Sequence, residues 1–166
     1  MNKKLLILGC GYSGRFISKQ LTAKGWRVFG TTRSKENFKK FEECEIEPIA
    51  WNDLSSFKYL ATGGCALLSS IAPRGSSDDG LARLEELLRD DRSNFTWFGY
   101  LSSTGVYGDR KGGWVTEDSN FDSINPQGKA RLEAEKKWVK LADTFNVPLF
   151  IFRLAGIYGP ERSIFE

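Results

Sequence analysis

The chain has 166 residues, of which 24 are Lys or Arg, 21 are Asp or Glu and none is His, so its net charge is +3. The absence of histidine excludes a Ser-His-Asp triad, a Cys-His pair, histidine metal ligands and an imidazole general base. A charge this small, with basic and acidic residues interspersed as in Glu135-Lys136, indicates a solvated surface and argues against a nucleic-acid partner.

The three cysteines are far apart in the sequence, and no two have metal-ligand spacing. We therefore expect no disulfide framework, no metal site and a reducing, cytoplasmic location. The apolar run at residues 5–8 is too short for a signal peptide, and no segment approaches the ~20 apolar residues of a membrane span. We expect no membrane partner.

Strand and helix patterns alternate along the chain. Apolar and β-rich runs predict strands at residues 5–8, 26–31, 46–51, 65–71, 96–101 and 147–154. Helical spacing predicts helices at residues 13–24, 35–44, 55–61, 81–88 and 129–145. This alternation predicts a Rossmann-type α/β fold, a doubly wound parallel sheet with helices on both faces. Ligands of such folds bind beyond the carboxyl ends of the strands.

A glycine motif follows the first predicted strand and opens the first predicted helix. Residues 9–14 have the sequence Gly-Cys-Gly-Tyr-Ser-Gly, which in this context is typical of a dinucleotide fingerprint. Gly9 would allow a tight turn, Gly11 the close approach of a pyrophosphate, and Gly14 the packing of the helix on the sheet. The helix start, at Tyr12 and Ser13, would offer free N–H groups to the phosphates. The alternative is a glycine-rich turn without a ligand.

The end of the second predicted strand indicates which cofactor binds. NAD-binding folds place Asp or Glu there, to accept hydrogen bonds from the ribose 2′-OH. Here Thr32, Arg33 and Ser34 stand at this point with no acid. Arg33 can pair with a 2′-phosphate, and its neighbours can add donors. We therefore expect NADP in preference to NAD, the alternative being that Arg33 is a solvated loop residue.

Polar residues at two further strand ends have two interpretations each. Asp53 either accepts a hydrogen bond from adenine or caps the following helix. Ser69 and Ser70 either donate to the cofactor or are ordinary strand-end residues.

These motifs and two later ones resemble the extended short-chain dehydrogenase/reductases, in particular the atypical group of NAD-dependent epimerase/dehydratase-like proteins. The later motifs are Tyr-Leu-Ser-Ser-Thr-Gly-Val-Tyr-Gly at 100–108 and Arg-Leu-Ala-Gly-Ile-Tyr-Gly-Pro at 153–160. The resemblance covers essentially the whole chain, and the glycine spacing is that of the atypical group. It implies an NAD(P)-binding oxidoreductase, epimerase or dehydratase that acts on a nucleotide-sugar-like or other small hydroxy or carbonyl substrate. It also allows a homodimer.

The resemblance further implies a catalytic Ser followed by Tyr-x-x-x-Lys, in which Tyr is the acid/base and Lys binds the nicotinamide ribose. Ser103 matches the Ser, but Gln127 stands at the Tyr position and Arg131 at the Lys position. Gln has no titratable proton. Arg131 can still bond the ribose, or it is a solvated helix charge. Tyr107 is a candidate substitute acid, with packing in the cleft wall as its default role.

The chain ends soon after the motif at 153–160, where members of the family continue into a substrate lobe. We expect residues 1–166 to be an NAD(P)-binding domain that lacks this C-terminal lobe. Two functions stay open. The glycine motif, Arg33 and Ser103 favour an enzyme, whereas Gln127 favours a non-catalytic dinucleotide-binding module, such as a redox sensor or pseudoenzyme.

Overall fold

The computed structural model describes residues 3–90 and 92–163, and six strands within them form one sheet. The strand order is β3-β2-β1-β4-β5-β6, and every neighbouring pair is parallel. The chain moves outward from β1 in one direction and then in the other, which confirms the doubly wound sheet that the sequence predicts. The strands are β1 (Lys4–Leu8), β2 (Arg27–Thr32), β3 (Ile46–Ala50), β4 (Cys65–Ser69), β5 (Phe95–Ser103) and β6 (Leu149–Leu154).

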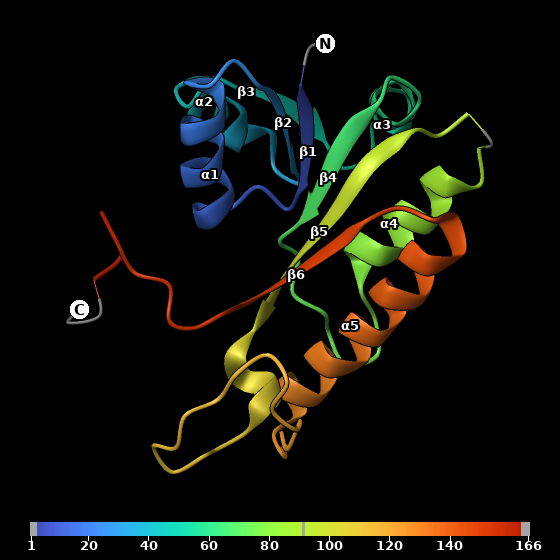
Figure 1. Cartoon of the computed structure of the whole chain (residues 1–166). Coiled ribbons are helices and arrows are strands. Elements are labelled where there is room, and N and C mark those ends of the chain that lie inside the picture. The colour runs from blue at the N-terminus through green and yellow to red at the C-terminus, as the bar shows by residue number, and fades with distance from the viewer. Residues whose placement is uncertain (1–2, 91, 164–166) are drawn as a thin grey trace.

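Helices cover both faces of the sheet (Figure 1). On one face lie α1 (Tyr12–Thr22) and α2 (Phe38–Glu42), and on the other lie α3 (Leu54–Thr62), α4 (Asp79–Leu88) and α5 (Pro126–Phe145). Successive residues of β1 show why: Leu5 and Ile7 pack on the first face, and Leu6 and Leu8 on the second. A strand buried on both faces is continuously apolar, as β1 is.

The predicted helices at 13–24, 55–61 and 81–88 lie within two residues of the observed bounds, and the other two differ more. The helix predicted at 35–44 is a 3-10 turn, η1 (Lys35–Asn37), followed by the short α2, because the Ser34 side chain accepts from Glu36 N and caps the turn. The last helix begins at Pro126 rather than at residue 129. Asn125 caps it by accepting a hydrogen bond from Gly128 N at 2.6 Å, and proline is favourable in a first turn.

The parallel strands bring the loops that follow them to one edge of the sheet (Figure 1). The glycine motif follows β1, and the 3-10 turn η2 (Thr104–Tyr107) follows β5. The candidate functional residues therefore gather at this edge. Among the described residues, no helix has both the length and the hydropathy that crossing a membrane requires.

Candidate functional site

The three glycines of the loop between β1 and α1 have different surroundings. Gly9 has φ +71°, and a Cβ there would lie 2.6 Å from the Ile71 side chain, so only glycine fits. A Cβ on Gly14 would lie 3.0 Å from Cys10 Sγ, so this glycine lets α1 pack closely on the sheet. The nearest atom to a Cβ on Gly11 would be 3.9 Å away, so the Gly11 backbone is open to a ligand. These surroundings match the three roles of a dinucleotide fingerprint.

Neighbouring strands hold this loop in place. Gly9 N donates to Thr31 Oγ1 at 2.8 Å, Cys10 N donates to the Thr31 carbonyl at 3.0 Å, and Ser70 Oγ donates to the Gly9 carbonyl. Gly11 is the N-cap of α1 and provides no side-chain acceptor for the first turn, which contains no acidic residue either. The first-turn N–H groups and the helix dipole therefore favour an anionic ligand.

A groove of about 220 Å³ lies along this loop. Its lining contains two arginines and no carboxylate, so its charge is complementary to phosphate. We call it the glycine-loop groove, and it is lined by Gly9, Gly11, Tyr12, Ser13, Ser70, Leu101, Ser102, Arg131, Leu154, Ile157 and Arg162.

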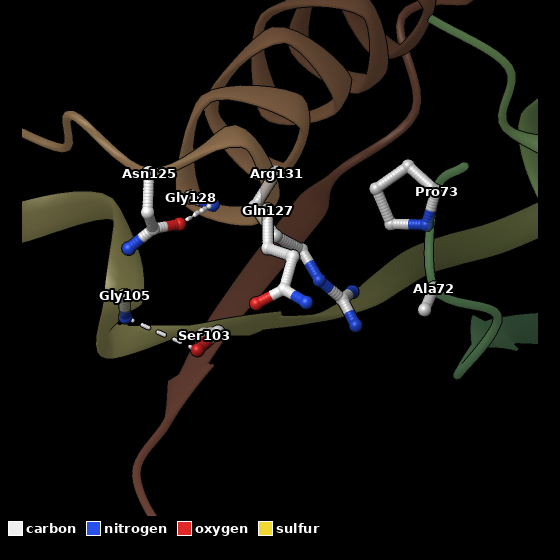
Figure 2. Close-up of a pocket in the computed structure, with 8 residues that line it drawn as sticks. All are labelled: Ala72, Pro73, Ser103, Gly105, Asn125, Gln127, Gly128 and Arg131. Carbon is white, nitrogen blue, oxygen red and sulfur yellow. Dashed lines mark hydrogen bonds between the residues drawn. The ribbon is translucent and has the colours of Figure 1, made fainter. Parts of the chain in front are cut away.

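A second cavity, of about 430 Å³, shares Arg131 with that groove. Figure 2 shows Gln127 and Arg131 extending from the start of α5 toward β5, where Ser103 lies. The structure thus brings together the three residues that the resemblance placed at the reaction centre. We call this cavity the α5 pocket, and it is lined by Ala72, Pro73, Ser103, Gly105, Asn125, Gln127, Gly128 and Arg131.

Arg131 is held at the junction of the two cavities. Its Nη1 donates to the Leu101 carbonyl at 2.8 Å and to Tyr100 Oη at 3.1 Å. The Tyr100 ring stacks on Trp138, whose Nε1 donates to Asp78 at 3.0 Å. Burial raises the pKa of Tyr100 to about 12, so its hydroxyl is neutral near pH 7. Within the described part of the chain, Arg131 Nε and Nη2 make no hydrogen bond to protein and can serve a ligand.

The α5 pocket offers hydrogen bonds rather than proton transfer. Ser103 Oγ accepts from Gly105 N at 3.1 Å, which leaves its hydroxyl proton for a ligand. Gln127 contributes an amide, and its side chain lies beside that of Arg131 (Figure 2). The lining residues include no carboxyl, phenol, thiol or lysine. The pocket is therefore suited to recognising oxygen atoms, but holds no group that titrates near pH 7.

Tyr107 lies outside both cavities. It is buried, and its hydroxyl accepts from Arg153 Nη1 at 2.8 Å. Arg153 also donates from Nη2 to Glu135 at 3.0 Å, and Glu135 is only 3% exposed. The prediction that Glu135 belongs to a solvated surface is therefore wrong, because the ion pair with Arg153 draws its carboxylate into the interior. The contacts of Tyr107 fit its default packing role.

A small cavity of about 60 Å³ lies at the ends of β2 and β3. Thr32 and the exposed Arg33 line it, together with Trp51 and Asp79, which the sequence analysis missed. Trp51 directly follows β3, so the rule that ligands bind beyond strand ends could have found it. The Ser34 side chain instead caps η1.

Asp53 and Ser69 line none of these three cavities. Asp53 accepts from Ser55 Oγ at 2.6 Å and from Ser56 Oγ at 2.7 Å, and these bonds lower the pKa of its carboxyl to about 2. It also accepts from Ser56 N, so it caps α3, and the capping alternative is the one that the structure shows. Ser69 is fully buried at the end of β4. Among the described residues, no cluster of His, Cys, Asp and Glu could hold a metal ion.

The sheet order and the glycine loop together define a Rossmann-type α/β fold. No family model matches the chain. It is 29% identical to Protein YeeZ of Escherichia coli K12 over 175 residues, which cover 96% of this chain and 61% of YeeZ. A solved structure of a functionally unknown conserved protein from Silicibacter pomeroyi DSS superposes with a TM-score of 0.84 at 37% identity, covering 98% of this chain and 56% of that one.

Two further solved structures have names that indicate an activity. One is assigned as an NAD-dependent epimerase/dehydratase from Methylobacillus flagellatus, with a TM-score of 0.76, 27% identity, and coverage of 98% of this chain and 57% of that one. The other is UDP-glucuronic acid 4-epimerase from Bacillus cereus in complex with NAD, with a TM-score of 0.75, 21% identity, and coverage of 94% and 57%.

These comparisons confirm the resemblance to NAD-dependent epimerase/dehydratase-like proteins over nearly the whole chain. The chain spans about three fifths of YeeZ and just over half of the similar solved structures.

Proposed function

We propose that this chain binds a nicotinamide dinucleotide and is the cofactor-binding part of an epimerase/dehydratase- or reductase-like enzyme that acts in the cytoplasm. The observation that carries the proposal is the glycine loop, with an open backbone at Gly11 and an uncapped first turn of α1. The pyrophosphate would lie against this turn, and Arg131 would reach the nicotinamide ribose. The Bacillus cereus epimerase, which has the same fold and is in complex with NAD, supports this choice of cofactor.

The α5 pocket is the proposed substrate site. A bound nicotinamide would supply hydride transfer to or from a substrate carbon. Ser103 would donate a hydrogen bond to the reacting oxygen, and the Gln127 amide would orient another oxygen of the substrate. This donor set suits a nucleotide-sugar-like or other small hydroxy or carbonyl substrate.

Arg33 makes NADP the preferred cofactor within this proposal. It lines the cavity beyond β2, and its neighbours at that strand end, Thr32 and Ser34, are not acidic; the carboxylate in this cavity, Asp79, comes from the start of α4. We expect the parent chain to bind NADP about 10-fold more tightly than NAD, and Arg33→Ala to remove that difference. Isothermal titration with both cofactors measures this. Arg89→Ala, which removes an exposed arginine at the end of α4, is the control. Equal affinities in the parent would contradict the NADP preference.

The lack of a titratable acid/base in the α5 pocket favours a second candidate, a non-catalytic dinucleotide-binding module. Hydride exchange with NADPH over a panel of nucleotide sugars, measured on the complete gene product, separates the two. Exchange that Ser103→Ala abolishes supports the enzyme. Tight dinucleotide binding without exchange supports the module. Exchange that Tyr107→Phe abolishes, in a variant that still binds the dinucleotide, would assign proton transfer to Tyr107.

A further inference from the structure

The chain that follows β6 turns back toward the start of α1 (Figure 1). Gly159 and Arg162 close a turn through two backbone hydrogen bonds of 3.0 Å. Tyr12, the first residue of α1, donates from its hydroxyl to the Pro160 carbonyl at 3.0 Å. A Cβ on Gly159 would lie 2.5 Å from that hydroxyl, so glycine permits the close contact. Residues 159–162 thus form a strap fastened to the glycine loop.

The strap places the side chain of Arg162 in the lining of the glycine-loop groove. Arg162 lines the groove together with Gly11 and Ser13, and its guanidinium lies 5.4 Å from the centre of the Tyr12 ring. No ion pair of Arg162 occurs among residues 3–90 and 92–163, and the groove lining includes no carboxylate. Stacking on Tyr12 restricts the guanidinium before any ligand arrives, which reduces the entropy that binding must remove.

The two arginines of this groove come from different elements. Arg131 is on α5 and donates to the Leu101 carbonyl, whereas Arg162 stacks on Tyr12 at the start of α1. In the proposed function Arg131 reaches the ribose, so the cation beside the phosphate-binding turn is Arg162. A guanidinium pairs well with phosphate because its planar fork can donate two parallel hydrogen bonds.

We propose that Arg162 is a pyrophosphate-binding residue of the dinucleotide site, and that the strap holds it over the first turn of α1. This proposal rests on the proposed function. Its ligand class is the diphosphate shared by NAD, NADP and ADP-ribose, so Arg162 contributes equally to all three. Arg33, by contrast, distinguishes NADP from NAD.

Isothermal titration of NAD, NADP and ADP-ribose into the parent, Arg162→Ala and Arg162→Lys tests the proposal. We expect Arg162→Ala to weaken all three ligands by about 10-fold and to leave the NADP-to-NAD affinity ratio unchanged. Arg162→Lys should recover part of the loss, since lysine keeps the charge without the fork. Raising the salt concentration should weaken the parent more than Arg162→Ala.

One control and one further variant accompany this titration. Arg89→Ala removes another exposed arginine, one that does not line the groove, and should bind as the parent does. Tyr12→Phe keeps the ring but removes the hydrogen bond to Pro160, so it should weaken binding by a smaller factor than Arg162→Ala. Because Arg162 is exposed, the thermal unfolding midpoint of Arg162→Ala should equal that of the parent.

The failing outcomes are distinguishable. Unchanged affinities in Arg162→Ala would overturn the role of Arg162 and leave the proposed function standing. A loss confined to NADP would place Arg162 at the 2′-phosphate and would also overturn the proposal. Failure of the folded parent to bind any of the three ligands would overturn the proposed function and this proposal together.

Discussion

Arg153, at the end of β6, connects three parts of the molecule around the site. Its Nη2 donates to Glu135 of α5 at 3.0 Å, and its Nη1 donates to Tyr107 Oη at 2.8 Å and to the Glu117 carbonyl at 3.2 Å. Glu135 in turn accepts from Ser102 Oγ at 2.5 Å. Because Ser102 precedes Ser103, and Glu135 lies one helical turn beyond Arg131, these bonds fix how far β5 and α5 stand apart at the α5 pocket.

Removing the Glu135 charge should destabilise the fold. Glu135→Gln leaves the largely buried Arg153 cation without its counter-charge, and we expect the free energy of unfolding to fall by about 3 kcal/mol. Urea unfolding followed by tryptophan fluorescence measures it. The matched control is Glu133→Gln on the same helix, which breaks an exposed pair with Lys136 and should change the free energy by no more than about 0.5 kcal/mol. Equal effects of the two variants would show that the Glu135–Arg153 pair has no special importance.

At the scale of single elements, a glycine in the first turn of α5, Gly128, allows this helix to lie close to η2. A Cβ on Gly128 would overlap the Gly105 carbonyl oxygen and would lie 2.8 Å from Ser123 Cβ. The absence of a side chain therefore brings the first turn of α5, and with it Gln127, against η2, which directly follows β5. The same turn and its N-cap supply two lining side chains of the α5 pocket, those of Gln127 and Asn125.

Adding a methyl group at this contact should move the helix. We expect Gly128→Ala to lower the free energy of unfolding by about 2 kcal/mol, because the backbone must shift to relieve the overlap. Lys129→Ala, at the next and exposed position, should change it by no more than about 0.5 kcal/mol. Chemical denaturation of both variants is the measurement. A Gly128→Ala chain as stable as the parent would mean that α5 does not depend on this close contact.

Most elements could be predicted from the sequence because their signals are local. Apolar runs locate all six strands, and the glycine motif locates the phosphate-binding turn. The helical spacing predicts a start at residue 129, whereas α5 begins at Pro126 behind the Asn125 cap. The anchoring of Arg131 by Tyr100, the burial of Glu135 and the contact of Tyr12 with the strap could not be predicted. They join residues 31, 18 and 148 positions apart, and only the folded topology brings such residues together.

Across the whole molecule, the core has two layers, one on each face of the sheet, and each layer contains one buried cysteine. Cys10 packs in the cluster under α1 and α2, and Cys65 in the cluster under α3, α4 and α5. Burial raises the pKa of both thiols from 9.0 to about 12, so at pH 8 both are neutral as well as shielded. Cys44 is partly exposed and is the third free cysteine.

These thiols report whether the two layers unfold together. At pH 8 we expect an aromatic disulfide reagent to modify Cys44 first, and Cys10 and Cys65 later at one shared rate, because a single sheet joins both layers. Mass spectrometry of the labelled peptides assigns each rate, and Cys44→Ser should retain only the slow phase. Because the pKa values of Cys10 and Cys65 are raised in the folded state, their neutral thiols favour folding. This contribution to stability is fully present below pH 9 and is lost as the pH rises toward 12. The slow phase should therefore accelerate with pH by more than the increase in thiolate alone explains. If Cys65 reacts well before Cys10, the helices on the two faces open independently.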